Sequence, residues 1–282
     1  MHTVTSWREL DEAIADPSFG RHPHHARATL VFRGLARVRY TNTSSLARMS
    51  GDYTKLERHL IRNFRKYAHH EAPGPTEWDW LALGQHHGLP TRLLDWTFSP
   101  LVALNFATAS WPDDDALLWA VDVEAVHRSL PDGLREALAD EGSLVFTTEL
   151  LADHAGGVGE LDRLRADEPF ALFFEPPALD ERIANQAAVL SIISDATCHM
   201  QGWLGARAGT CRVWRIPAGL KTEVRERLDQ AHVNERVLMP GLDGLAAWLR
   251  RYYSPRAVVE DVDPGASMDG RDARAQVEGS MA

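Results

Sequence analysis

The chain has 282 residues, of which 44% are hydrophobic and 25% charged, as in a globular protein of one large domain or two small ones. Its formal net charge of −10 argues against non-specific binding of nucleic acid through the whole surface. No apolar run approaches the roughly 18 residues of a membrane span, the N-terminus lacks a secretory signal, and Cys198 and Cys211 offer no disulfide framework, so we expect a cytoplasmic protein.

The N-terminal part of the chain reads as helix, strand and helix. Ser6 and Glu9 fit a capping box, which predicts a short helix over 6–15. An apolar run predicts a strand over 28–34, and apolar residues with the spacing i, i+3, i+7 predict an amphipathic helix over 51–70.

The rest of the chain mixes helices and strands without a regular alternation. In chain order we expect a helix over 76–88, a turn-rich connection over 90–100, a buried helix over 101–110, a strand over 116–126, a partly helical segment over 130–165, an extended segment over 170–177, a polar start leading into a strand over 181–194, a strand over 210–217, and helices over 218–230 and 242–253. This order favours an α+β fold with a mixed or antiparallel sheet over a doubly wound fold.

The strand over 28–34 ends in Arg33 and Gly34, although its apolar run predicts burial. A guanidinium presents a planar fork of donors that matches phosphate oxygens. Glycine has no Cβ, so a ligand or another backbone can approach it closely. Arg33 therefore contacts an anionic ligand, forms an internal ion pair, or does both.

Asp95 stands between Leu94 and Trp96, in an apolar setting that predicts burial. A buried carboxylate needs a partner or loses its charge. Arg33 or Arg92 is the natural partner, so Asp95 is more readily explained as a residue that organises arginines than as a reacting group.

A basic stretch runs from Arg33 to Lys66, with nine Lys or Arg residues against two acids. Arg58, Arg62 and Arg65 fall within its predicted helix. A local basic face on an acidic protein suits a phosphate-bearing ligand. A solvated helix face that is balanced by acids elsewhere explains the same pattern equally well.

Metal ligands and nucleotide loops are poorly represented. His22, His24 and His25 fall in a predicted loop, and Cys198 with Cys211 misses the paired spacing of zinc sites. Neither a Walker loop nor a GxGxxG motif occurs. We therefore expect no metal.

Four stretches together resemble the FRG-domain family, which is named for a Phe-Arg-Gly motif. They are "VFRG" at 31–34, "LGQHHGLPTRLLDWTFSPLVALNFA" at 83–107, "RIANQAAVLSI" at 182–192 and "RVLMPGLDGLAAWL" at 236–249. The second stretch is long and specific. The resemblance runs from about residue 5 to about residue 253, so it implies a single FRG-like domain over 1–253. Residues 254–282 lack periodicity and are expected to be a disordered tail.

The same pattern is similar, more distantly, to the ADP-ribosyltransferase superfamily. That resemblance implies a split β-sheet flanked by helices, with NAD as co-substrate. Arg33 would bind the phosphates or the nicotinamide ribose of NAD, and Thr97 or Ser99 would take the hydroxyl position of the second motif. Gln186 stands where the superfamily has a catalytic glutamate. Because an amide supplies no full charge, a nearby acid, Glu181 or Glu235, would have to help.

The resemblance also implies which residues would line an NAD pocket. The candidates are Arg33, Gly34, Gln85, His86, His87, Asp95, Trp96, Thr97 and Ser99. Adjacent histidines point to different faces, so at most one of His86 and His87 faces the pocket, and capping or core packing explains them equally well. Trp80 and Trp96 could stack on a base, although core packing is the commoner role of Trp.

The resulting hypothesis is transfer of ADP-ribose from NAD to a nucleic-acid base or a protein side chain. Arg58, Arg62 and Arg65, as substrate-binding residues, favour DNA or RNA as the acceptor. Such chemistry suits a bacterial toxin or anti-phage effector with an antitoxin or immunity partner. The alternative is a module that binds a nucleotide or nucleic acid without chemistry, which the glutamine at position 186 favours. A purely structural interaction domain is the third possibility.

Overall fold

The computed structural model describes residues 1–16, 18–20, 29–49, 53–165 and 167–254. Its strands are β1 (His2–Thr3), β2 (Leu30–Leu35), β3 (Leu94–Thr97), β4 (Ala116–Asp122), β5 (Ala171–Phe174), β6 (Ala188–Ile193) and β7 (Cys211–Ile216). Its helices are α1 (Trp7–Ile14), α2 (Tyr53–Tyr67), α3 (Glu77–His86), α4 (Pro100–Thr108), α5 (Val123–His127), α6 (Asp132–Glu141), α7 (Thr148–His154), α8 (Val158–Leu164), α9 (Glu181–Asn185), α10 (Met200–Gly205), α11 (Lys221–Gln230), α12 (Glu235–Leu238) and α13 (Leu242–Tyr253), with short 3-10 turns at Leu46–Arg48 and Ala218–Leu220.

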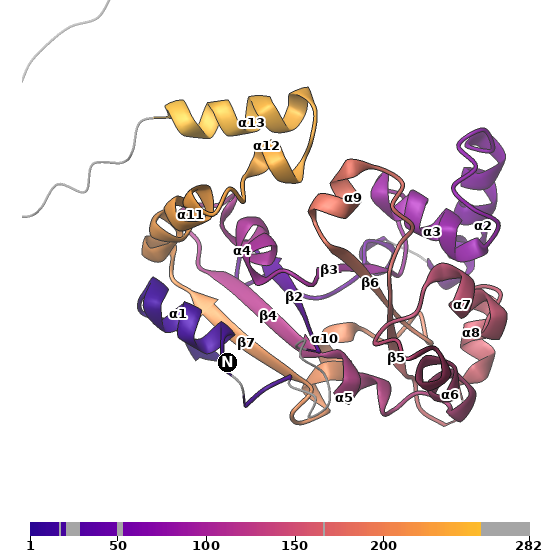
Figure 1. Ribbon diagram of the computed structural model, residues 1–282. Coiled ribbons are helices and arrows are strands. Elements are labelled where there is room, and N and C mark those ends of the chain that lie inside the picture. Colours follow the sequence, from indigo (N-terminus) through magenta and orange to yellow (C-terminus); the bar gives the residue numbers. More distant parts are fainter. Residues whose placement is uncertain (17, 21–28, 50–52, 166, 255–282) are drawn as a thin grey trace, which may run out of the picture.

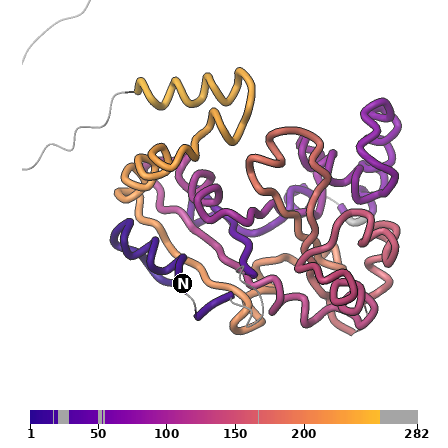
Figure 2. The backbone as a smooth tube through the Cα atoms, viewed as in Figure 1, coloured from indigo at the N-terminus to yellow at the C-terminus, as the bar shows by residue number. Residues whose placement is uncertain are grey.

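The strands form one sheet in the order β1-β7-β4-β2-β3-β6-β5, with helices around it (Figure 1). The β1–β7 pair is parallel and the other neighbours are antiparallel, so the sheet is mixed. Figure 2 shows the indigo N-terminal segment beside the orange β7, although the two are more than 200 residues apart in the sequence. The prediction of an α+β fold with a mixed sheet and flanking helices is confirmed.

The joint between β2 and β3 has the fewest registered residue pairs of the sheet. Along these two strands a single residue pair, Phe32 with Thr97, is in register. By contrast, β2 shares six registered pairs with β4, and β3 shares four with β6. The strands thus form one sheet that is nearly divided at this joint, and the predicted ADP-ribosyltransferase-like split sheet is not confirmed.

Side chains alternate across the sheet and bury both of its faces. On β4, Leu117 and Trp119 point to one face while Leu118 and Ala120 point to the other, as the period of a strand requires. The first face carries one continuous apolar cluster, which α5 and α10 cover. The opposite face carries two separate clusters, one with α1, α4 and α11 and one with α2, α3, α6, α7 and α8. A gap between these two clusters therefore lies over the middle of the sheet.

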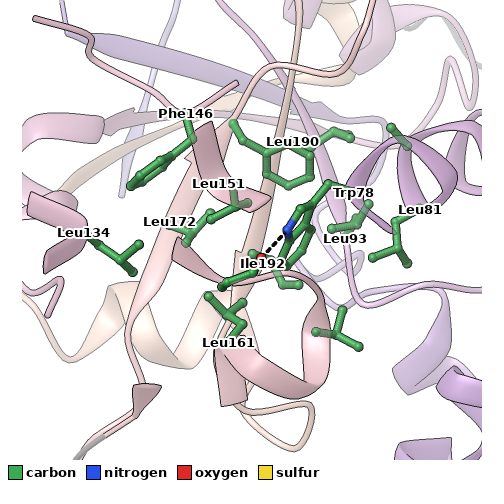
Figure 3. Packing of buried hydrophobic residues seen from close by; sticks show 14 of the residues in the cluster. Trp78, Leu81, Leu93, Leu134, Phe146, Leu151, Leu161, Leu172, Leu190 and Ile192 are labelled. Atoms are coloured by element: carbon green, nitrogen blue, oxygen red, sulfur yellow. Dashed lines mark hydrogen bonds between the residues drawn. The ribbon is translucent and has the colours of Figure 1, made fainter. Parts of the chain in front are cut away.

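The cluster beneath α3 is built around Trp78, which is fully buried (Figure 3). Its indole Nε1 donates to the carbonyl oxygen of Ala155 at 2.7 Å, so the buried polar atom has a partner. Its ring meets Phe174 edge-on at 5.7 Å. A capping box between Thr76 and Asp79 fixes the start of α3. These contacts hold α3 against β5 and the end of α7.

On the other side of the gap, α4 packs directly on β2 at Gly34. A Cβ at this glycine would lie 1.9 Å from the carbonyl oxygen of Ala103 and 2.7 Å from the amide nitrogen of Ala107. The sequence predicted that a ligand or another backbone approaches this glycine closely. The backbone of α4 makes that close approach.

A buried ion-pair group ties α2 and α8 to the segment before β3. Arg92 donates from Nε to both carboxylate oxygens of Glu57, at 2.9 and 2.8 Å, and from Nη1 to Asp162 at 2.6 Å. Burial lowers the pKa of Arg92, but hydrogen bonds to the two carboxylates outweigh it and leave that pKa above its ordinary value. Arg92 is thus paired within the core and is not the partner of Asp95.

Several predicted boundaries were wrong. The connection predicted over 90–100 contains β3, and the strand predicted over 116–126 ends at Asp122, whose carboxylate caps α5. Glu9 does not reach back to Ser6: it accepts instead from the backbone nitrogen of Thr5, while Ser6 caps α1 as expected. The tail predicted over 254–282 lies outside the described residues from position 255 onward.

None of the helices in the described ranges has the length and apolar character needed to cross a membrane. The same part of the chain holds no cluster of three or more His, Cys, Asp or Glu side chains suited to a metal ion. His22, His24 and His25 lie outside the described residues.

Candidate functional site

A cavity of about 350 Å³ lies over the β2–β3 joint, between α4 and α3. Its volume falls in the range of small-molecule sites. Eight of the predicted site residues line it: Arg33, Gly34, Gln85, His86, Asp95, Trp96, Thr97 and Gln186. We call this hollow the joint cavity. It forms where the two apolar clusters of one sheet face leave their gap and where the strands below diverge.

Arg33 lies where β2 and β3 part. Its Nη1 donates to the backbone carbonyl oxygen of Asp95 and lies 3.9 Å from the Asp95 carboxylate. Its Nε is buried and has no hydrogen-bond partner among the described residues. Burial lowers the pKa of this guanidinium, and the nearby Arg48 adds to that effect while Asp95 opposes it. Arg33 thus combines the ion pair predicted for it with an unused donor.

The apolar neighbours of Asp95 predicted that it would be buried, and this prediction was wrong. The alternation of side chains along β3 turns Asp95 away from the core. The Asp95 side chain is 62% exposed. Gln85 on α3 donates from Nε2 to Asp95 at 2.9 Å and accepts with Oε1 from the hydroxyl of Thr91 at 2.5 Å. Gln85 therefore holds the carboxylate at the wall of the joint cavity.

The two histidines that end α3 have different surroundings. His86 lines the joint cavity, and its Nε2 lies 2.8 Å from a carboxylate oxygen of Asp180. Partial burial raises the pKa of Asp180, but the backbone nitrogen of Ile183 and the ring of His86 outweigh burial and hold that pKa below its usual range. His87 is exposed at the end of the helix and does not line the cavity. One of the pair faces the cavity, as predicted.

The predicted motif around Thr97 and Ser99 contributes to the wall of the joint cavity and also stabilises the fold around it. The Thr97 hydroxyl donates to the carbonyl oxygen of Gln186 at 2.7 Å and accepts from the backbone nitrogen of Ser99 at 3.0 Å. Ser99 caps α4 and is not part of the cavity wall. Trp96 is 3% exposed and donates from Nε1 to the hydroxyl of Ser191 at 2.7 Å. Trp96 is thus a core residue with an edge at the cavity.

The three residues predicted as catalytic do not meet. Gln186 lines the joint cavity, and its amide nitrogen donates to the carbonyl oxygen of Leu238 at 2.8 Å. Glu181 is exposed and outside the cavity wall. Glu235 belongs to an ion-pair network with Arg225 and Arg251 that ties α11, α12 and α13 together. Among these three, only Gln186 is placed to contact a ligand in the cavity.

Arg182 is a cavity residue that the sequence analysis did not select as a site residue. It lies on α9 beside Gln186 and lines the joint cavity, and its Nε is buried without a hydrogen-bond partner in the described structure. Its position in the stretch "RIANQAAVLSI" was the available signal. Asp180 also went unnoticed, although an Asp immediately before a helix start is a typical N-cap.

Arg58, Arg62 and Arg65 line a different and larger cavity of about 620 Å³ between α2 and the start of α8. The two cavities share no lining residue. The chemistry of the basic helix is therefore separate from that of the joint cavity.

Comparisons with curated proteins and with solved structures found no match. The family model described as FRG domain matches residues 28–116. This range contains β2 with its Phe-Arg-Gly stretch, α3, β3 and α4, which together provide the floor and two walls of the joint cavity. The predicted resemblance to the FRG family is confirmed over residues 28–116, the part of the chain that this family model matches.

Proposed function

We propose that the joint cavity binds NAD and that the chain transfers ADP-ribose from it. The observation that carries this proposal is the convergence of Arg33 and Arg182 on one cavity, each with a buried Nε that lacks a partner among the described residues. An unsatisfied buried donor is costly, so a ligand that accepts from both is favoured. Two guanidinium groups suit the pyrophosphate of a dinucleotide.

The residues around the cavity have different roles in the proposed reaction. Arg33 and Arg182 would hold the phosphates, and the side-chain carbonyl of Gln186 would accept from a ribose hydroxyl. Asp95 is the cavity carboxylate that can stabilise positive charge on the ribose, because Gln85 fixes it at the wall. Glu181 and Glu235, which were expected to help, lie outside the cavity wall. Asp95 is thus a better candidate for this role than either of them.

In the proposed transfer, the bond between ribose C1′ and nicotinamide breaks, nicotinamide leaves with the electron pair, and the acceptor's nucleophile bonds to C1′. The proton of the acceptor passes to the carboxylate of Asp95. The nearly divided sheet supports the likeness to ADP-ribosyltransferases, since the cavity opens where the strands part. The acceptor is a nucleic-acid base or a protein side chain, and a toxin or anti-phage role stays a prediction.

Incubation with NAD labelled in its adenylate moiety tests this function. Mixtures of DNA, RNA and protein serve as acceptors, and free nicotinamide is quantified. Release of nicotinamide with label on an acceptor, lost in Asp95→Asn and kept in the exposed-surface variant Arg8→Gln, is the expected result. Bound NAD that stays intact with every acceptor would contradict transferase activity.

A second candidate is a module that binds a nucleotide without chemistry. The glutamine at position 186 favours it, because its amide nitrogen is committed to Leu238 and it supplies no charge. This candidate predicts a raised melting temperature with NAD or ADP-ribose and no release of nicotinamide.

A further inference from the structure

A basic groove lies between α2 and the segment that leads into α8. Arg58, Arg62 and Arg65 follow each other at i, i+4 and i+7, so they share one face of α2, and Lys66 stands beside them. All four are exposed. We call this hollow of about 620 Å³ the α2 groove. On a chain of net charge −10, such a concentration of cations is a local exception.

The acids of the α2 groove do not neutralise these arginines. Glu77 accepts from the backbone nitrogen of Val158 at 3.0 Å, and Glu160 accepts from that of Gly156 at 2.7 Å. Glu160 also lies 3.8 Å from Arg163. Within the described residues, none of the three α2 arginines has a carboxylate oxygen within 4.0 Å. The groove therefore keeps a positive field that favours several negative charges in a row.

Aromatic packing fixes the position of one of these cations. The guanidinium of Arg65 lies 5.6 Å from the ring centroid of Trp80, which is buried beside it. A row of exposed cations along a groove is the arrangement that follows the phosphates of a nucleic-acid strand.

We propose that the α2 groove binds nucleic acid through its phosphates. Arg58, Arg62 and Arg65 contact successive phosphates of one strand. The helix α3 links the groove to the joint cavity, because Glu77 in its first turn lines one and Gln85 in its last turn lines the other, about 12 Å along the helix axis. Binding in the groove is independent of NAD. That the bound nucleic acid is also the acceptor of ADP-ribose rests on the function proposed above.

Fluorescence anisotropy with labelled oligonucleotides, without NAD, tests this inference. The probes are one single-stranded oligonucleotide of mixed sequence and the duplex of the same length, titrated at several salt concentrations. The variants are Arg58→Gln/Arg62→Gln/Arg65→Gln and a control, Arg128→Gln/Arg135→Gln/Arg227→Gln, which removes the same charge from exposed positions outside the groove. Circular dichroism melting verifies that both variants fold.

We expect the wild type to bind both probes. With the single strand, the slope of log affinity against log salt should be shallower by about 2 in the groove variant, since each phosphate contact on a single strand contributes about 0.7. The control variant should bind as the wild type does.

Two results would overturn the inference: no binding of either probe by the wild type, or equal losses of affinity in the groove and control variants. Because the assay contains no NAD, each of these results is distinguishable from a failure of the proposed transferase function. Nucleic-acid binding in the groove without any release of nicotinamide from NAD would support the groove inference and contradict the proposed transferase function.

Discussion

Arg33 on β2 donates a hydrogen bond from Nη1 to the backbone carbonyl oxygen of Asp95 on β3. The two strands share one registered pair, Phe32 with Thr97, so this side-chain bond joins them where backbone pairing has ended. The Nε of the same guanidinium is buried and has no partner among the described residues, and Arg33 also lines the joint cavity. One residue thus bridges the gap in the sheet and borders the cavity above it.

The packing of α4 on β2 makes a sharp prediction about Gly34. In Gly34→Ala the new Cβ would meet the carbonyl oxygen of Ala103 at 1.9 Å, and neither backbone can move without opening the cluster of α1, α4 and α11. We expect a loss of unfolding free energy of about 1–3 kcal/mol or more, measured by urea denaturation. Gly133→Ala is the matched control, because a Cβ there has nothing within 4 Å and alanine favours the helix. Equal stability of the two variants would contradict this packing.

The buried ion pairs of Arg92 predict a large effect on stability. Arg92→Met leaves Glu57, which is 2% exposed, as a buried charge without its partner. We expect a loss of about 3–5 kcal/mol, or an unfolded protein. The control Arg135→Met removes an exposed pair with Asp132 and should cost about 1 kcal/mol or less. A small effect at Arg92 would show that Glu57 is not buried as described.

His127 predicts an acid sensitivity of the fold. Its ring is 6% exposed and accepts with Nε2 from the backbone nitrogen of Phe173 at 3.0 Å. Burial lowers its pKa to about 3. The unfolded chain takes up a proton near pH 6.5 while the folded one does not, so stability falls as the pH drops from about 6.5 toward 3, by about 2 kcal/mol between pH 7.5 and 5.

Urea denaturation of the wild type and of His127→Gln at these two pH values isolates the contribution of this histidine. The variant is less stable at neutral pH, since it loses ring packing against Phe146 and Phe173. Its remaining pH dependence should be smaller than that of the wild type by the amount given above. An identical pH dependence in both proteins would mean that His127 titrates normally in the fold.

Much of the fold follows from local patterns. The apolar run over 28–34 and the spacing along α2 identify their elements, because burial on a sheet or on one helix face fixes the period of the side chains. The strand β3 escaped prediction, since it has only four residues, of which Asp95 is exposed. Pro90 and Thr91 before it and Ser99 and Pro100 after it resemble turns. The end of β4 was missed because Val123 and Val126 continue its apolar run as a helix.

The site was predictable where a motif carried it, and not where it depends on distant contacts. Arg33, Gln85, Asp95 and Thr97 all come from the Phe-Arg-Gly stretch and the long second motif, and the fold brings them to one cavity. The role of Glu235 could not be read from sequence, because Arg225 and Arg251 reach it only through the packing of three helices. Likewise, nothing local distinguishes the unpaired Nε of Arg182 from that of a solvated arginine.

Asp95 offers a direct test of the proposed chemistry. Asp95→Asn keeps the shape of the side chain and its contact with Gln85 while removing the charge. If the carboxylate stabilises charge on the ribose, release of nicotinamide should fall about 100-fold to 1,000-fold while NAD affinity changes little. Rapid-quench measurement of nicotinamide with saturating NAD separates the two effects. Full activity in this variant would remove Asp95 from the chemistry.

The central claim is that the joint cavity binds a pyrophosphate through Arg33, and isothermal titration calorimetry with NAD tests it most directly. The wild type should bind NAD, and Arg33→Gln should bind it about 10-fold to 100-fold more weakly, since a hydrogen bond to a charged group is lost. Arg8→Gln, on the exposed face of α1, should bind as the wild type does. The claim would be contradicted by a wild type that shows no heat of binding, or by a folded Arg33→Gln that binds NAD with unchanged affinity.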